Sequence, residues 1–343
     1  MPFEIVRNDI TNMRVDAIVN PGNREPVIGY GVDLGIYKKA GPALLEARRA
    51  VGRIEPGEAA LTEGFSLPAR YVIHTVGTSW QGGDRGETNL LGSCYRKTLA
   101  LAAEAGCESI AFPLMGAGTL GFPREIAMQI AVRACSEFLM THDMDISLVV
   151  FHREVVQLSE KLFHRVKSYI DECYVRETLE EESCPGDFAL EDLRWEQRCF
   201  SVPEKMPIEM SQPVEDDWET VKSLRELLLQ KDAGFAQNLV ERIEASGRKN
   251  SEVYKKANVD KKLFSKIINN VNYHPSKQTA LAFAIALELD LPQTLDLIGR
   301  AGFTLTHSSK FDIIIEYFIK NRSYDIFEIN EVLFRFDQSL LGA

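Results

Sequence analysis

The order of strand-like and helix-like segments constrains this chain more than any other feature. Up to residue 171, short runs rich in Val and Ile alternate with stretches whose apolar residues recur at helical spacing. The strand-like runs are 3–10, 15–20, 59–65, 71–76, 109–114 and 146–151, and the helix-like stretches are 32–51, 87–105, 123–140 and 154–171. This alternation predicts an α/β layered domain over residues 1–171 with a largely buried sheet.

From residue 226 onward the periodicity is helical throughout. Short helices are expected at 235–245, 251–256, 260–269, 276–289 and 291–301, and two more near 309–320 and 325–336. They predict a smaller all-α domain over residues 226–343. The intervening residues 172–225 read as an acidic connector, because the periodicity weakens and prolines accumulate there. Trp195, Phe200 and Trp218 suggest that parts of it dock on a neighbouring domain.

Charge is distributed unevenly along the 343 residues. Residues 171–230 alone carry a net charge equal to the −11 of the whole chain, because they contain 17 acidic and 6 basic residues. Residues 248–277 instead hold eight Lys and Arg against two acids, which suits either a polyanion partner or a solvated helical face. The six cysteines form no C-x-x-C or zinc pattern, and no apolar run is long enough to span a bilayer. We expect reduced thiols, no metal site, no membrane contact and a cytoplasmic location.

Residues 116–121 read Gly-Ala-Gly-Thr-Leu-Gly, the pattern G-x-G-x-x-G. Such a run lets backbone N–H groups approach a phosphate closely, because glycine has no Cβ atom. In a dinucleotide-binding fold, this pattern belongs to the first strand–helix turn, and an acid ends the next strand about 20 residues later. Here the run follows the fifth strand-like segment, and the acid at that offset, Glu137, falls within a predicted helix. A dehydrogenase is therefore disfavoured, and no cofactor is expected.

Several separated motifs resemble the macrodomain family in order and spacing. They are VDAIVNPGN at 15–23, GYGVDLG at 29–35, YVIHTVG at 71–77 and SIAFPLMGAGTLGFP at 109–123. The resemblance covers residues 1–170 and implies a mixed central sheet sandwiched by helices. It also implies that ADP-ribose, or an ADP-ribosylated substrate, binds across the carboxyl ends of the strands. The two glycine loops would then close on one diphosphate from opposite sides.

The resemblance also assigns roles to individual residues. Asp9 would hydrogen-bond the adenine amino group beside Ile10, and Phe151 would stack on the adenine; a turn cap and a core aromatic are the alternatives. Asn23 and Asp33 would be the catalytic pair of a hydrolase acting on mono-ADP-ribosyl esters of proteins or on O-acetyl-ADP-ribose. In that pair, Asn23 orients the distal ribose and Asp33 positions or activates the attacking water. The other predicted ligand-binding residues are Asn20, Gly31, Val32, Gly35, Gly116, Ala117, Gly118, Thr119, Leu120 and Gly121.

Departures from the family pattern keep a second function open. Tyr30 interrupts the first glycine loop, Leu34 replaces the glycine after Asp33, and Leu120 stands where an aromatic is usual. These residues favour a catalytically weak sensor that binds ADP-ribose and is coupled to the helical domain. Asp33 can also act simply as a cap of the helix that follows it. His74, inside a predicted strand, is expected to be structural.

The stretch 251–305 resembles the helix-turn-helix core of lambda-repressor-like regulators. Residues 251–257 would form the first helix, 258–259 the turn and 260–269 the recognition helix. An outward face able to meet nucleic acid would consist of Lys261, Lys262, Ser265, Lys266 and Asn269. A module for docking or oligomerisation is the alternative, because the same motif also serves as a packing unit in proteins that never touch DNA.

Overall fold

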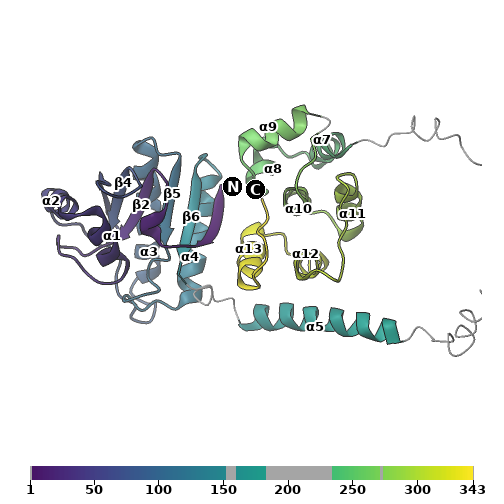
Figure 1. The fold of residues 1–343 in the computed structure, drawn as a ribbon, viewed down its shortest axis with the longest axis horizontal. Coiled ribbons are helices and arrows are strands. Elements are labelled where there is room, and N and C mark those ends of the chain that lie inside the picture. Colours follow the sequence, from purple (N-terminus) through teal and green to yellow (C-terminus); the bar gives the residue numbers. More distant parts are fainter. Residues whose placement is uncertain (1, 152–159, 183–233, 271–272, 343) are drawn as a thin grey trace, which may run out of the picture.

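The first half of the chain folds around a six-stranded sheet with helices on both faces (Figure 1). The computed structural model describes residues 2–151, 160–182, 234–270 and 273–342. Neighbouring strands are parallel except for the antiparallel pair β3–β4 at one edge, and the spatial order is β1-β6-β5-β2-β4-β3. The strands are β1 (Phe3–Arg7), β2 (Ala17–Pro21), β3 (Ala59–Glu63), β4 (Tyr71–Thr75), β5 (Ser109–Pro113) and β6 (Asp145–Val150).

Four helices form the two outer layers of this half. The buried side chains of α3 and α4 pack on one face of the sheet, and those of α1 and α2 pack on the other. Tyr95 of α3 lies against Phe112 of β5 at 5.2 Å between ring centroids, whereas Ile36 and Leu44 fill the opposite face. The bounds are α1 (Val32–Ala40), α2 (Pro42–Val51), α3 (Glu87–Glu104) and α4 (Arg124–Leu139). The prediction of a mixed sheet sandwiched by helices is confirmed.

Two expected elements differ in detail from the structure. The stretch 32–51 forms two helices rather than one, because Gly41 takes φ 86° and Pro42 then starts α2. A proline suits a helix start, since its missing N–H has no partner to lose in the first turn. The first strand ends at Arg7, and Ile10 lies in a short 3₁₀ helix, η1 (Ile10–Asn12), that Asp9 caps.

The C-terminal half is helical, as predicted. Its helices surround one apolar core that includes Leu281, Phe283 and Ile314. They are α7 (Phe235–Ser246), α8 (Asn250–Lys256), α9 (Lys261–Asn269), α10 (Lys277–Ala286), α11 (Leu291–Gly299), α12 (Lys310–Lys320) and α13 (Ile326–Arg335). Within the described residues, no helix combines the length and apolarity needed to cross a bilayer.

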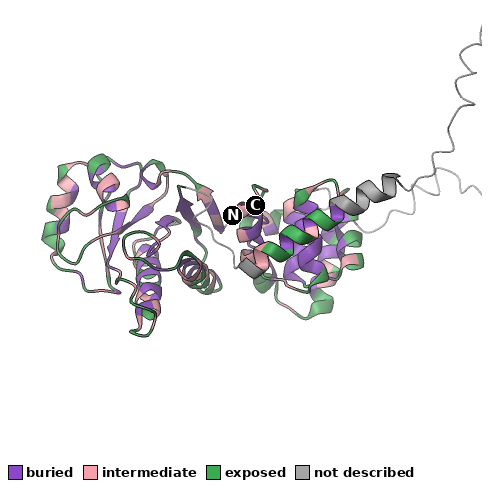
Figure 2. Cartoon of the chain, turned by 90° about the horizontal axis from the view of Figure 1, so that it is seen from below, coloured by how far each residue is buried: buried purple, intermediate pink, exposed green. Residues whose placement is uncertain are grey.

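Helix α5 (Glu160–Glu182) belongs by its packing to the helical half (Figure 1). Val166, Ile170 and Cys173 are buried in the same core as α12, and Figure 2 shows exposed residues along the opposite side of α5. Most of this helix falls within the predicted first domain, because apolar spacing does not identify the partner against which a helix packs. We propose that the helical domain starts with α5, before the predicted boundary at 171. Residues 183–225 of the predicted connector, with Trp195, Phe200 and Trp218, lie outside the described residues, as do residues 226–233.

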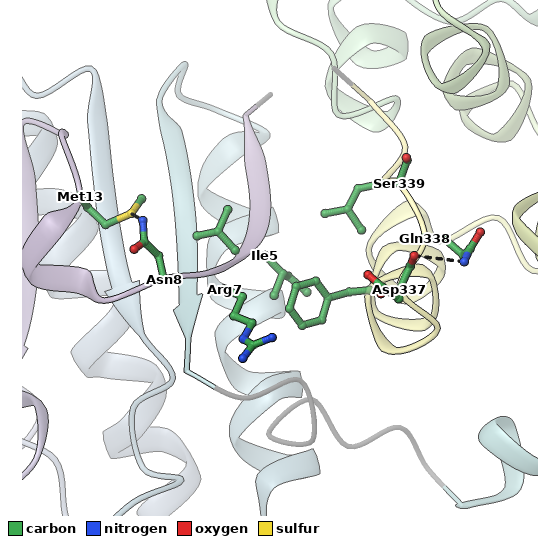
Figure 3. A pocket seen from close by; sticks show the side chains of 10 residues that line it. Ile5, Arg7, Asn8, Met13, Asp337, Gln338 and Ser339 are labelled. Atoms are coloured by element: carbon green, nitrogen blue, oxygen red, sulfur yellow. Dashed lines mark hydrogen bonds between the residues drawn. The ribbon is translucent and has the colours of Figure 1, made fainter.

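The two halves meet along β1, which is an edge strand of the sheet (Figure 1). Phe3 of β1 packs edge-on against Phe327 of α13 at 5.4 Å between ring centroids. Lys255 of α8 donates to the carbonyl oxygens of Met140 and His142 at the end of α4, at 3.2 and 3.4 Å. At the same junction, an open groove of about 510 Å³ lies between the end of β1 and residues 337–340 (Figure 3).

Candidate functional site

A pocket of about 520 Å³ lies at the carboxyl ends of β2, β4 and β5. Each strand is followed by one wall of the pocket: residues 21–24 with 28–33, residues 76–77, and residues 113–120 apart from Ala117. Carboxyl ends of neighbouring parallel strands are the usual ligand position in open α/β sheets, because the loops that follow them converge there. Both glycine-containing loops of the sequence analysis therefore border one cavity.

Asn23 and Asp33 converge on Gly29 inside this pocket. The Asp33 carboxylate accepts hydrogen bonds from the Gly29 N–H and from Asn20 Nδ2, the latter at 2.7 Å. A Cβ atom at Gly29 would lie 3.0 Å from Asn23 Nδ2 and 3.2 Å from Asp33 Oδ2, so the missing side chain keeps the space between the two residues open. Asn23 Nδ2 also donates to the Val27 carbonyl at 3.0 Å. Ten residues apart in sequence, Asn23 and Asp33 flank a single point in space.

Asp33 is almost completely buried, at 3% exposure. Burial raises the pKa of its carboxyl group above 3.8, and the bonds from Gly29 and Asn20 and the charge of Arg48 offset only part of that rise. Asp33 is the second residue of α1, whose N-cap is Gly31 at φ 64°. Its carboxylate bonds back to a residue outside the helix and does not cap α1 by the usual N-cap geometry.

A line of buried polar side chains continues from Asp33 into the sheet. Asn20 Nδ2 lies 3.1 Å from His74 Nδ1, and His74 Nε2 lies 3.0 Å from Thr62 Oγ1. Burial and the Arg48 charge lower the pKa of His74 to about 3, so its imidazole is neutral. Because Asn20 Nδ2 is a donor, His74 Nδ1 is the acceptor of that hydrogen bond. The ring hydrogen of His74 is therefore on Nε2, which donates a hydrogen bond to Thr62 Oγ1. His74 is structural, as expected, and it fixes the amide that holds Asp33.

Arg48 of α2 contacts the other side of the pocket wall. It is 2% exposed, and its guanidinium donates to the carbonyl oxygens of Asn23 at 3.0 Å and Arg24 at 3.1 Å, and also to that of Gly52. Neither Arg48 nor His74 was singled out from the sequence as a residue that supports the site. One signal was available for Arg48: it follows Leu44 by four residues, which places both on the same face of α2.

The second glycine loop adopts backbone geometry that glycine favours. Gly116 and Gly121 have φ of 88° and 73°, and Phe122 N bonds to Gly116 O at 3.1 Å, which closes the turn. Leu120 lies against Gly77, where a Cβ atom would come within 2.7 Å of Leu120 Cδ1. The apolar wall that Leu120 makes therefore depends on a glycine in the facing loop.

The structure brings together some of the predicted site residues but not others. Those that line the pocket are Asn23, Gly31, Val32, Asp33, Gly116, Gly118, Thr119 and Leu120. Those outside its lining are Asp9, Ile10, Asn20, Gly35, Ala117, Gly121 and Phe151. Asp9 Oδ1 accepts from Thr11 N and Oγ1, both at 2.9 Å, Ile10 is buried in the core, and Phe151 is 53% exposed. Exposure of Phe151 removes the alternative of a core aromatic.

The predicted outward face of α9 is exposed as expected. Lys261, Lys262, Ser265, Lys266 and Asn269 are all exposed, and Phe264 and Ile267 are buried. Lys261 and Lys262 line a pocket whose opposite wall carries acids of the first half: Glu108, Asp143 and Asp145. Lys266 lies over the Tyr273 ring at 5.0 Å from its centroid.

Within the described residues, no group of three or more His, Cys, Asp or Glu is arranged to hold a metal ion.

Comparison with known proteins places the first half in a family. The model of the Macro domain matches residues 19–131. A Macro domain-containing protein of Methanosarcina mazei is 44% identical over 166 residues, which are 48% of this chain and 89% of that protein. This chain belongs to the Macro domain family through its N-terminal half.

Two further matches have more specific names. A protein of Citrobacter rodentium named O-acetyl-ADP-ribose deacetylase is 43% identical over 166 residues, covering 47% of this chain and 94% of that protein. Among solved structures, the Oceanobacillus iheyensis macrodomain with ADP is 35% identical, covers 48% of this chain and 92% of that chain, and has a TM-score of 0.44. The resemblance of residues 251–305 to lambda-repressor-like regulators has no support from these comparisons and stays a prediction.

Proposed function

We propose that the N-terminal half binds ADP-ribose and hydrolyses the ester that joins its distal ribose to a protein side chain or to an acetyl group. The observation that carries this proposal is the convergence of Asn23 and Asp33 on one side of a pocket bordered by two glycine loops. Relatives named O-acetyl-ADP-ribose deacetylase, at 41–43% identity over the same length, support the reaction class.

The diphosphate fits between the two glycine loops. Gly31 is the N-cap of α1, and the free N–H groups in the first turn of a helix favour an anion. Gly118, for which a Cβ atom would meet nothing within 4 Å, leaves the facing loop open to a close approach. A diphosphate in this position directs the distal ribose toward Asn23 and Asp33.

Asn23 and Asp33 have complementary chemistry for ester hydrolysis. The Asn23 amide can hold a ribose hydroxyl, and ionised Asp33 can take a proton from the water that attacks the ester. The water oxygen bonds to the ester carbon that it attacks, and the C–O bond between that carbon and the leaving oxygen breaks. The proton taken up by Asp33 passes to the leaving oxygen, and the products are free ADP-ribose and the released acid or protein. Since burial raises the pKa of Asp33, its carboxylate is a stronger base than an exposed aspartate.

Two observations favour the second candidate, an ADP-ribose sensor with little turnover. Both oxygens of Asp33 already accept hydrogen bonds, and Tyr30 at the pocket rim is 85% exposed. A sensor needs a pocket that binds ADP-ribose but no catalytic turnover. In this candidate function, the helical domain contacts the partner. For that domain we propose protein docking over DNA binding, because carboxylates of the first half face Lys261 and Lys262.

The hydrolase and the sensor are separated by one assay on the full chain. Auto-mono-ADP-ribosylated protein and O-acetyl-ADP-ribose are incubated with wild type, Asp33→Ala, Asn23→Ala and Glu46→Ala. Glu46 is an exposed acid on α2 and is the matched control. The hydrolase proposal expects release by wild type and the control, with loss of at least about a hundredfold in the two pocket variants. If all four proteins release equally negligible amounts of ADP-ribose or acetate, and calorimetry still shows that ADP-ribose binds, the result rules out the hydrolase and supports the sensor.

A further inference from the structure

Arg48 is a buried cation with no carboxylate at ion-pair distance among the residues that the structure describes. It is the one Lys or Arg among the described residues that is buried. Removing an arginine from water is costly unless its donors are satisfied. Here three backbone carbonyls satisfy them, those of Asn23, Arg24 and Gly52.

These contacts tie the loop after β2 to the end of α2. The Arg24 carbonyl also accepts from Ile54 N at 3.0 Å, so two donors from one segment hold the same peptide group. Two exposed ion pairs, Arg24–Glu55 and Arg53–Glu25, run between the same segments on the outside. Exposed pairs contribute little, and the buried Arg48 contacts therefore dominate the attachment.

The charge of Arg48 also reaches the pocket. It is among the causes that lower the pKa of Asp33 against the effect of burial, and it helps to depress the pKa of His74. Nearby, burial and the Asp33 charge raise the pKa of Tyr37 to about 12, so the phenol stays neutral. With His74 and Tyr37 neutral, Arg48 is the buried cation among the described residues whose charge favours an ionised Asp33, in addition to the bonds from Gly29 and Asn20.

We propose that Arg48 is a positioning residue with two separable roles in the hydrolysis. Its planar guanidinium fixes the backbone of residues 23 and 24, which places the Asn23 side chain. Its positive charge stabilises Asp33 as the carboxylate. This inference rests on the proposed hydrolase function, since it concerns the same site.

The two roles predict different behaviour of two variants. Arg48→Lys keeps the charge but loses the planar fork that reaches separate carbonyls. We expect its kcat to fall about tenfold through misplaced Asn23, with the acid limb of the pH profile unmoved. Arg48→Met loses both contacts and charge. Its kcat is expected to fall further, and its acid limb to move to higher pH, because Asp33 then ionises later.

The experiment measures kcat and KM of the full chain from pH 4 to 9 on O-acetyl-ADP-ribose. Arg49→Met is the matched control, because Arg49 is exposed and neighbours Arg48 on the same helix. Circular dichroism and titration of ADP-ribose sites give the folded, binding-competent fraction by which each rate is divided. If Arg48→Met does not fold, Arg48→Gln, which is also neutral, takes its place.

A purely structural Arg48 lowers the folded fraction and leaves the acid limb where it is in wild type. That result, or a kcat within twofold of wild type per folded molecule in both variants, overturns the proposal. A shifted acid limb in the neutral variant alone supports it. Absence of hydrolysis by wild type at every pH is a different result, because it removes the proposed function itself.

Discussion

Asn258 and Phe3 lie 255 residues apart in sequence and form a two-bond pair across the junction of the halves. Asn258 Oδ1 accepts from Phe3 N at 2.9 Å, and Asn258 Nδ2 donates to Phe3 O at 2.7 Å. The side-chain amide thus pairs with the outer edge of β1 as a neighbouring strand would. An exposed strand edge invites pairing with other chains, and this contact covers part of it.

Replacing Asn258 should weaken the attachment of the helical half. Asn258→Ala loses both bonds and places alanine at φ 53°, so we expect the free energy of unfolding to fall by about 2–4 kcal/mol. Asn258→Gly tolerates this φ and should lose about 1 kcal/mol less. Urea unfolding of both variants, with exposed Asn269→Ala as control, measures the difference. Equal stability of all three and wild type would show that the pair contributes nothing.

Gly29 keeps open the space between Asn23 and Asp33. In Gly29→Ala the new methyl group must push one of the two side chains aside, since it would lie 3.0–3.2 Å from both. We expect a loss of about a hundredfold in kcat with little change in melting temperature. Gly299→Ala, which meets open space in α11, is the control. Unaltered turnover in Gly29→Ala would contradict the convergence of the pair at this point.

Stability should depend on pH through Glu331 of α13. Burial, and then the acids Asp325, Glu328 and Glu125, raise its pKa from 4.5 to about 8. A carboxyl group with a raised folded pKa supports the fold fully below pH 4.5, and that contribution is lost as the pH rises to 8. Glu331→Gln should therefore be more stable than wild type by about 2 kcal/mol above pH 8, and equal to it at pH 4.

Denaturant unfolding of Glu331→Gln and wild type at pH 4, 6 and 8.5 checks this prediction. The exposed acid Glu46, changed to Gln, provides the control. A difference that is the same at all three pH values would assign the effect to packing and not to titration.

The basic face of α9 should contribute little to nucleic-acid binding. Lys255 is paired with Asp143 at 3.6 Å, and Lys261 and Lys262 line a pocket that the same acid borders. A phosphate placed there would meet carboxylates as well as lysines. Gel shifts of duplex DNA at 50 and 200 mM salt should show weak binding that the double change Lys261→Gln and Lys262→Gln leaves unaltered. Tight, steeply salt-dependent binding that the double change abolishes would restore the DNA-binding interpretation.

Local sequence patterns predicted the elements and the two glycine loops, because periodicity and glycine act over a few residues. The spacing of Asn23 and Asp33 led to the pocket through a family resemblance. What the patterns did not reveal depends on contacts between distant segments. The step of four residues from Leu44 puts Arg48, unlike exposed Arg49, on the buried face of α2, but it does not reveal which carbonyl groups the guanidinium contacts.

The same limit explains the packing of α5 and the junction of the halves. The apolar stripe of α5 predicts a helix with a buried face but does not identify α12 as its partner. Asn258 was predicted as a turn residue, and its φ of 53° agrees with a turn. Its partner on β1 lies at the other end of the chain, and no sequence period connects the two.

We propose that the pocket at the ends of β2, β4 and β5 binds ADP-ribose beside Asn23 and Asp33. Isothermal titration of the full chain with ADP-ribose tests it most directly, with Gly118→Val as the variant that fills the open approach in the second glycine loop. We predict saturable binding of one ADP-ribose per chain by wild type and binding at least about tenfold weaker in the variant. No heat from wild type at millimolar ADP-ribose, or equal affinity in both proteins, would contradict the account.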